Sequence, residues 1–197
     1  MSGPGRPRGF DRGEALRTAM RLFWARGYEA VSITDLTAAM GIGTRSLYTA
    51  FGSKELLFRE AVELYESADA TARYCDRPTA RQAVEDMLRA RAESYAGPDG
   101  PPGCMVVLAA TNTSPGNDTV RDLLAELRTR DREMLTRRLV RAKAAGELAD
   151  HADPAAVTSF YLTVLYGMSI QARDGSDTAT LQGVVDAALS VWDVLVT

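Results

Sequence analysis

The stretch SITDLTAAMGIGTRSLYTAFGSK, residues 32–54, decides how this chain folds. Ser32 and Asp35 have the spacing of a capping box, in which the Ser32 hydroxyl accepts from the Asp35 amide and the carboxylate accepts from the Ser32 amide. We expect the short helix that follows to turn one apolar face inward: Ile33, Leu36, Ala39 and Met40. Gly41 predicts the end of that helix, because glycine enters a left-handed turn without a steric penalty.

A second short helix is expected to begin at Gly43-Thr44, after Ile42 has entered the core. Leu47 and Phe51 are four residues apart and therefore face inward together, with Ala50 beside them. Polar and basic residues remain on the outer side of this helix: Thr44, Arg45, Tyr48 and Thr49. Two short helices joined by a glycine-containing turn, the second with an exposed polar face, predict a helix-turn-helix.

These residues also resemble a known family. Residues 41–51 (GIGTRSLYTAF), followed by SKELL at 53–57, are similar to the DNA-binding signature of the TetR family of bacterial transcriptional regulators. The apolar run from Ala15 to Trp24, then Arg26-Gly27-Tyr28 and Thr34, fits as well, and the resemblance covers roughly residues 10–65. Arg45 replaces a residue that is often small in the family, and Thr49-Ala50 replace a frequent aromatic pair. The operator sequence therefore does not carry over.

Composition and charge are those of a globular protein with one basic end. The 197 residues are 46% hydrophobic and 25% charged, which are ordinary globular values. Residues 1–55 hold eight Arg and Lys against five Asp and Glu, whereas the rest of the chain carries a net charge of −6. A basic head on an acidic body suits a protein that touches a polyanion at one end only.

Other residue types argue against metal or disulfide chemistry. Cys75 and Cys104 lack any motif spacing and read as cytosolic thiols rather than as a disulfide. His151 lies alone in a polar connector, so we expect no zinc site, and no feature predicts a cofactor. The start of the chain has no secretory signal. These features predict a cytoplasmic protein, and the resemblance implies that it is bacterial and associated with the nucleoid.

Residues 1–10 contain three glycines, two prolines and two arginines, which predicts a flexible basic arm. Arg6 and Arg8 either reach phosphates or a minor groove or belong to a solubilising tail. We expect residues 11–55, beginning with a helix capped by Asp11, to be the DNA-binding domain and residues 56–197 to be the ligand-binding and dimerisation domain. A fourth helix of about 20 residues is expected after Ser53. Lys54 in its first turn either contacts a phosphate or is solvated.

Later helices are expected at about 79–95, 118–145, 153–173 and 178–196, giving about nine in all. The arginines of 118–145 alternate with acids, which predicts a salt-bridged solvent face rather than a nucleic-acid site. The segment 153–173 is long enough for a membrane-spanning helix, but its Ser and Thr residues and its acidic upstream flank argue against one. The last two helices are apolar on nearly every face, and burial against a second copy accounts for this. The interface candidates are Phe160, Val164, Val184, Leu189 and Trp192. The resemblance implies the same dimer.

The resemblance also implies an effector pocket among the body helices, for an unknown and largely apolar small molecule. Methionines and aromatic residues at such spacing belong to a core more often than to a pocket. The candidate lining residues are Tyr65, Met87, Leu88, Arg91, Tyr95, Met105, Leu108, Asn112, Met134 and Tyr161. Arg91 lies in an otherwise apolar helical row. Its guanidinium is either paired internally or placed to meet an acidic group of a ligand.

Together these features predict an all-α protein with an N-terminal three-helix helix-turn-helix domain and a C-terminal helical ligand-binding and dimerisation domain. We expect a homodimeric regulator, a repressor released from a palindromic double-stranded operator by its effector. We expect four residues to contact the edges of DNA bases: Thr44, Arg45, Ser46 and Thr49. Three more are expected to contact DNA phosphates: Thr34, Tyr48 and Lys54. The alternatives are an effector-independent activator or architectural DNA-binding protein, and a small-molecule enzyme. For an enzyme the sequence offers no Ser/His/Asp set, phosphate loop or metal-ligand cluster.

Overall fold

The structure, a computed structural model, describes residues 10–68, 71–111, 113–114 and 116–197. These residues form ten α-helices and one 3₁₀ helix and contain no strand, which confirms the all-α prediction. The elements are α1 (Arg12–Arg26), α2 (Ile33–Met40), α3 (Thr44–Phe51), α4 (Lys54–Ala68), η1 (Thr71–Asp76), α5 (Ala80–Ala96), α6 (Met105–Ala110), α7 (Asp118–Ala144), α8 (Pro154–Arg173), α9 (Thr178–Ser190) and α10 (Trp192–Val196). The helix expected over 178–196 is divided at Val191 into α9 and α10.

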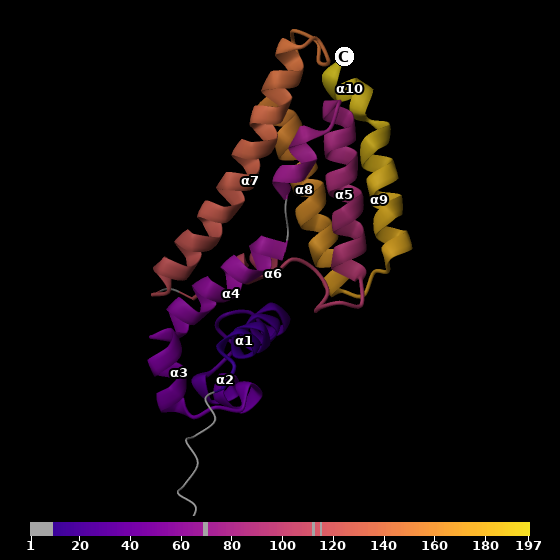
Figure 1. Cartoon of the computed structure of the whole chain (residues 1–197). Helices are drawn as coiled ribbons and strands as arrows, with labels where there is room; N and C mark the ends of the chain where they lie inside the picture. The colour runs from indigo at the N-terminus through magenta and orange to yellow at the C-terminus, as the bar shows by residue number, and fades with distance from the viewer. Residues whose placement is uncertain (1–9, 69–70, 112, 115) are drawn as a thin grey trace, which may run out of the picture.

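Figure 1 shows α1–α3, which we call the head, at one end of an elongated molecule, and η1 to α10, which we call the body, at the other. α4 leads from the head to the body. The helix expected after Ser53 is shorter than predicted, because α4 ends at Ala68 and the 3₁₀ helix η1 lies between it and α5. No helix of the described residues combines the length and the apolarity that crossing a membrane requires.

The local signals at the start of the chain form the caps that they predict. Ser32 Oγ accepts from the Asp35 amide at 3.1 Å and Asp35 Oδ2 accepts from the Ser32 amide at 2.8 Å, which completes the capping box of α2. Gly41 ends α2 in the left-handed region with φ 65°. One detail differs. Ala39, expected on the inner face, is exposed, because Leu36 and its neighbours already fill the contact with α1.

An aromatic cluster holds the head against α4. The ring of Phe23 in α1 meets Phe58 of α4 edge-on at 5.1 Å between centroids, and Tyr28 lies 5.1 Å from the same Phe58 ring. Leu36 and Leu47 are fully buried beside this cluster. Edge-to-face aromatic pairs add to the stability gained from burial alone. α4 is therefore a packed member of the head core as well as the connection to the body.

The body is a bundle of long helices in which α5, α7, α8 and α9 pack around one core (Figure 1). Ion pairs such as Arg121–Asp118 at 2.7 Å lie on the outside of α7, as the alternation of charges predicts. Arg138 departs from that pattern. Only 5% of its surface is exposed, and its guanidinium donates to the carbonyls of Arg77 and Pro78 and to Glu147. This arginine ties α7 to the segment before α5 instead of facing solvent.

The C-terminal end of α1 is held by the body at two points. Trp24 Nε1 donates to the Gly103 carbonyl at 2.8 Å. Arg173, the last residue of α8, donates to the carbonyls of Trp24 and Ala25 at 2.7 and 2.8 Å. A cation at the free carbonyls of a helix C-terminus is favoured by the helix dipole. The end of α8 therefore caps the end of α1.

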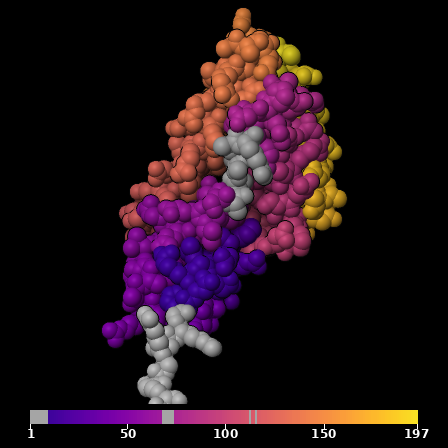
Figure 2. Space-filling view, in the orientation of Figure 1, coloured from indigo at the N-terminus to yellow at the C-terminus, as the bar shows by residue number. Residues whose placement is uncertain are grey.

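A third contact joins the head to the beginning of α7. Glu29, in the turn between α1 and α2, accepts from the Ser114 amide at 2.8 Å and from Asn117 Nδ2 at 2.7 Å. The Ser114 hydrogen bond is the main cause that holds the pKa of Glu29 below its usual value. Figure 2 shows α7, in orange, running along one side of the body down to the head. The head is thus fixed by α7 and α8 in addition to α4.

Candidate DNA-binding surface and effector cavity

The outer face of α3 is an open polar surface. Leu47 is fully buried and Phe51 is 3% exposed, so these residues fix the inner side of the helix. The residues assigned to base edges are all exposed: Thr44, Arg45, Ser46 and Thr49. Tyr48 is 46% exposed beside them. Arg45 and Thr49 are four residues apart and therefore share one face of α3. Thr44, Ser46 and Tyr48 are exposed to either side of it.

Arg12 fixes the C-terminal end of α3, a role that no sequence pattern predicted. Its guanidinium donates to the Ala50 carbonyl at 3.2 Å and to Glu60 of α4 at 2.7 Å. The same group lies 4.5 Å from the centre of the Phe51 ring, within the range of a cation–π contact. Arg12 therefore joins α1, α3 and α4. No local motif marks an arginine in the first turn of a helix for such a long-range contact.

Lys54 occupies a less open position than a solvated lysine. Its ammonium lies 4.1 Å from the centre of the Tyr28 ring, and burial lowers the pKa of Lys54 against the opposing effect of Glu29 and Glu55. Ser53 caps the same end of α4, since its hydroxyl accepts from the Leu56 amide at 3.1 Å. The other predicted phosphate ligands, Thr34 and Tyr48, are exposed. The phosphate contacts of all three remain predictions.

Some of the predicted site residues fall outside the described part of the chain. Arg6 and Arg8 of the arm lie there, and so does Asn112 of the effector set.

A hollow of about 650 Å³ opens where the head meets the body, and we call it the junction hollow. Two predicted effector residues, Tyr65 and Arg91, line it. The remaining lining residues come from α1, η1, α5 and the following loop: Met20, Trp24, Tyr74, Ala90, Glu93, Ser94, Gly97, Pro98, Asp99 and Gly100. The contribution of α1 was missed, because sequence reasoning assigned that helix to the DNA-binding domain alone.

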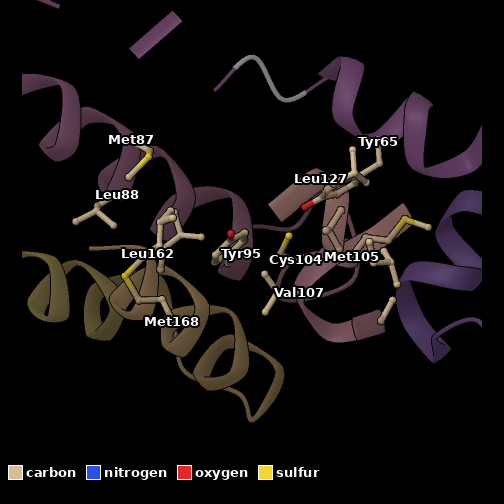
Figure 3. Packing of buried hydrophobic residues seen from close by; sticks show 14 of the residues in the cluster. Tyr65, Met87, Leu88, Tyr95, Cys104, Met105, Val107, Leu127, Leu162 and Met168 are labelled. Atoms are coloured by element: carbon tan, nitrogen blue, oxygen red, sulfur yellow. The ribbon is translucent and has the colours of Figure 1, made fainter. Parts of the chain in front are cut away.

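A much smaller space of about 20 Å³, the inner cavity, lies deeper in the body. Arg91 lines both spaces, and Met87 and Tyr95 of the predicted set line this one with Cys104, Glu66 and Asp131. Figure 3 shows Cys104 between Tyr95 and Tyr65. The Tyr95 hydroxyl and Arg128 Nη1 are buried there and have no hydrogen-bond partner among the described residues. A space of this size holds about one water molecule.

The other predicted effector residues lie elsewhere. Leu108 lines a third hollow of about 200 Å³ beside Trp24 and Arg173. Leu88 and Tyr161 are fully buried, Met105 is 1% exposed and Met134 is half-buried, and none of the four lines these three spaces. The Tyr161 hydroxyl donates to the Ala188 carbonyl at 3.2 Å, so its polar group is already occupied within the core.

The interface candidates divide into two groups. Leu189 and Trp192 are each 5% exposed, because they pack inside their own protomer, with the Trp192 ring 5.7 Å from that of Tyr161. Phe160, Val164 and Val184 are half-buried and keep surface for a partner. Ile170 at 46% and Val194 at 83% exposure extend the same apolar character along α8 and α10. Little surface of Leu189 and Trp192 remains for a second copy.

An all-helical body that carries a helix-turn-helix with an open polar face defines a DNA-binding regulator of the helix-turn-helix class. Comparison with known proteins agrees. Residues 15–61 match the family model described as bacterial regulatory proteins, tetR family, and residues 78–188 match that of the tetracyclin repressor-like C-terminal domain. The chain belongs to the TetR family of bacterial transcriptional regulators, and the family and the relatives described below are regulators rather than enzymes.

Individual relatives cover nearly the whole chain. The transcriptional repressor ComR of Escherichia coli K12 is 33% identical over 98% of this chain and 93% of its own length. The repressor BdcR of the same organism is 33% identical over 87% of this chain and 84% of its length. Among solved structures, the TetR-family regulator CifR, a cysteine mutant complexed with 26-bp operator DNA, matches with a TM-score of 0.90 and 42% identity, covering 95% of this chain and 100% of that one.

Proposed function

We propose that this protein is a transcriptional repressor that binds a palindromic DNA operator as a homodimer and releases it when a small molecule binds the body. The observation that carries the proposal is the α3 surface, where Thr44, Arg45 and Thr49 are exposed on a helix whose other side is buried through Leu47 and Phe51. The naming of ComR and BdcR as repressors, and the operator complex of CifR, support this assignment.

Base contacts are assigned to Thr44, Arg45, Ser46 and Thr49, because hydroxyl and guanidinium groups are the donors and acceptors that read major-groove edges. Thr34, Tyr48 and Lys54 flank them and are assigned to phosphates. Lys54 would exchange its position over the Tyr28 ring for a phosphate oxygen. The basic arm with Arg6 and Arg8 would add contacts in the adjacent groove.

The dimer is assigned to the exposed sides of α8 and α9. Phe160, Val164 and Val184 are half-buried there, and the apolar surface continues to Ile170 and Val194. α8 has no Asp, Glu, Lys or Arg before Arg173, so a second copy could cover this face without burying charge. A twofold axis between the protomers would set two α3 helices one helical turn, or a multiple of it, apart on DNA.

The same proposal divides the chain into a DNA-binding domain at residues 11–55 and a ligand-binding and dimerisation domain at 56–197. α4 begins at Lys54, close to this boundary, and shares its packing between the two. Repression of a chromosomal operator would place the protein at the nucleoid in the cytoplasm.

Selection of bound sequences from a random pool of duplex DNA tests the proposal. We expect enrichment of two inverted copies of one short sequence, with centres about 34–36 Å apart or at a multiple of one turn, and binding that weakens steeply with salt. Absence of binding to any duplex at low ionic strength would overturn it. Repeating the binding measurement with a panel of metabolites separates an effector-released repressor from an effector-independent DNA-binding protein, whose affinity no compound would change.

A further inference from the structure

The junction hollow has the size and the walls of a small-molecule site. Its volume of about 650 Å³ falls in the range of about 300–1,000 Å³ that is typical of ligand pockets. Met20 and Trp24 of the head line it together with Tyr65 of α4, Tyr74 of η1 and Arg91 of α5. Any occupant of this hollow would therefore touch the head and the body at once.

We infer that the junction hollow binds the effector, a neutral and largely apolar molecule with a flat ring, and that Trp24 transmits its presence to the head. This inference rests on the proposed function, because only a repressor released by an effector needs such a link.

The preference for a flat apolar molecule follows from the aromatic walls. The Trp24 ring meets Tyr65 edge-on at 5.0 Å between centroids and an angle of 71°. Rings arranged in this way accept a further ring in offset or edge-on contact. Met20, Ala90 and Pro98 complete the apolar lining, and methionine adapts to irregular ligand shapes.

The preference for a neutral molecule follows from the charged residues that line the junction hollow. Of the described residues that line the hollow, Arg91 alone carries a positive charge, and Glu66 and Asp131 line the inner cavity together with it. Burial raises the pKa of Asp131 and of Glu66, and the positive charge of Arg91 opposes both shifts. Glu93 and Asp99 are exposed at the rim, where water and salt screen them. Among the described lining residues, a charged ligand would lose its hydration without finding an uncompensated opposite charge.

Trp24 connects the hollow to the contacts that hold α1. Its indole N–H donates to Gly103 and its carbonyl accepts from Arg173. The ring also lies against the loop, since a Cβ added to Gly100 would come within 2.3 Å of Trp24 Cζ3. The Gly103 carbonyl is itself fixed, because this glycine has φ 82° and a Cβ there would lie 2.6 Å from the Ser169 carbonyl oxygen. A ligand that turned the indole would therefore break its bond to the body and disturb the end of α1.

Trp24 provides its own signal for the test. The chain has two tryptophans, so the W192F variant reports on Trp24 alone. Three probes share a phenyl ring on a three-carbon chain and end in a neutral, an anionic or a cationic group: 3-phenylpropanol, 3-phenylpropionate and 3-phenylpropylammonium. None absorbs at the red edge of the indole band. We expect the alcohol to change Trp24 emission with a midpoint in the millimolar range and both ions to bind at least about tenfold more weakly. If W192F fails to fold, the difference between wild type and W24F gives the same signal.

A pair of matched variants locates the site. Ala90→Phe fills the hollow from α5, whereas Ala144→Phe makes the same change at an exposed position of α7. We expect Ala90→Phe to abolish the emission change and Ala144→Phe to keep it. With the duplex selected above, saturating alcohol should weaken the operator binding of wild type and Ala144→Phe at least about fivefold, and leave that of Ala90→Phe unchanged.

The outcomes distinguish this inference from the proposed function. Operator binding without probe tests the proposed function first, and the emission titration needs no DNA. An unchanged emission with every probe, an ion that binds as well as the alcohol, or a response that survives Ala90→Phe would each overturn the inference while leaving operator binding intact. Binding of the alcohol in the hollow without any loss of operator affinity would overturn the role of Trp24.

Discussion

The head and its junction with the body are built from contacts of very different range. The caps that define α2 and α3 join residues three or four positions apart, such as Ser32 with Asp35. The contacts that orient the head join residues 79 positions apart at Trp24–Gly103 and 149 apart at Trp24–Arg173. The head therefore takes its shape from local rules, whereas its position depends on side chains from the far end of the chain. The following variants test this division, beginning with the largest expected effect.

Leu47→Ala should destabilise the folded head. Leu47 is fully buried, and removing such a side chain from a packed core costs about 2–5 kcal/mol. We expect loss of DNA binding and a lower free energy of unfolding in urea denaturation. Leu56→Ala is the matched control, because Leu56 is 51% exposed, and it should change stability by less than about 0.5 kcal/mol. Equal effects of the two variants would contradict the packing of α3.

Val164→Glu should break the assembly of the body while leaving each head folded. A carboxylate at this half-buried position of α8 would face its own copy across the proposed twofold axis. We expect the dimer dissociation constant to rise by about 100-fold, or about 2.8 kcal/mol, in analytical ultracentrifugation. Val140→Glu makes the same change on α7, where Val140 is 51% exposed, and should remain dimeric. A dimeric Val164→Glu protein would place the interface elsewhere.

Arg173→Met should loosen the junction without altering either region. The variant keeps an unbranched apolar side chain but removes both hydrogen bonds to the end of α1. Hydrogen bonds to a charged donor are worth about 1.5–3 kcal/mol, so we expect a loss of this size in stability, together with faster hydrogen exchange in α1. Arg137→Met removes an exposed arginine whose partner Glu133 is 3.5 Å away and should cost less than about 1 kcal/mol.

Arg45→Ala and Lys54→Ala should distinguish contacts to the DNA bases from contacts to the DNA phosphates. Loss of Arg45 is expected to cost about 1–3 kcal/mol for the selected operator and to relax its sequence preference. Loss of Lys54 should weaken all sequences evenly and reduce the slope of log K against log salt by about one. Competition binding with operator and random duplex at several salt concentrations measures both. If neither variant changes affinity, the assignment of the α3 surface is wrong.

Glu29→Gln should produce the smallest effect, one that depends on pH. The Ser114 amide is the main cause that lowers the pKa of Glu29 from its usual 4.5. Its contribution to stability is therefore fully present above about pH 4.5 and is lost as pH falls through the lower folded value. We expect wild type to exceed the variant by less than about 1 kcal/mol near neutral pH. The difference should vanish in strong acid when urea denaturation is followed across pH. A constant difference would exclude the charge as its source.

The sequence predicted the head well because its signals act within a single turn of helix. The Ser32–Asp35 spacing and Gly41 predicted the start and the end of α2, and the pairing of Leu47 with Phe51 predicted the buried side of α3. Ala39 was placed on the wrong side because periodicity alone does not say how wide the buried stripe is. Arg12 was missed because its three partners belong to other elements.

The body and the cavity were predicted less completely for the same physical reason. Tyr65 and Arg91 were found as pocket candidates, but Trp24 and Met20 reach the hollow only through the way α1 docks on the body. Leu189 and Trp192 were predicted to lie in the dimer interface, because an apolar helix face does not by itself show whether another helix of the same protomer or a second copy covers it. In the structure they pack within their own protomer. The buried Arg138 likewise depends on carbonyls about 60 residues earlier, at Arg77 and Pro78.

The cap that Arg173 places on α1 has a consequence for how distances are kept in the assembled protein. α8 carries the proposed interface in its middle and grips the carbonyls of Trp24 and Ala25 at its end. In a dimer, α8 would thus hold the head, and with it α3, at a set distance from the twofold axis. This link does not depend on the connecting helix α4 alone. The contact of Arg173, together with those of Trp24 and Glu29, would then resist bending of α4, and the separation of the two α3 helices would change freely only when these contacts are released.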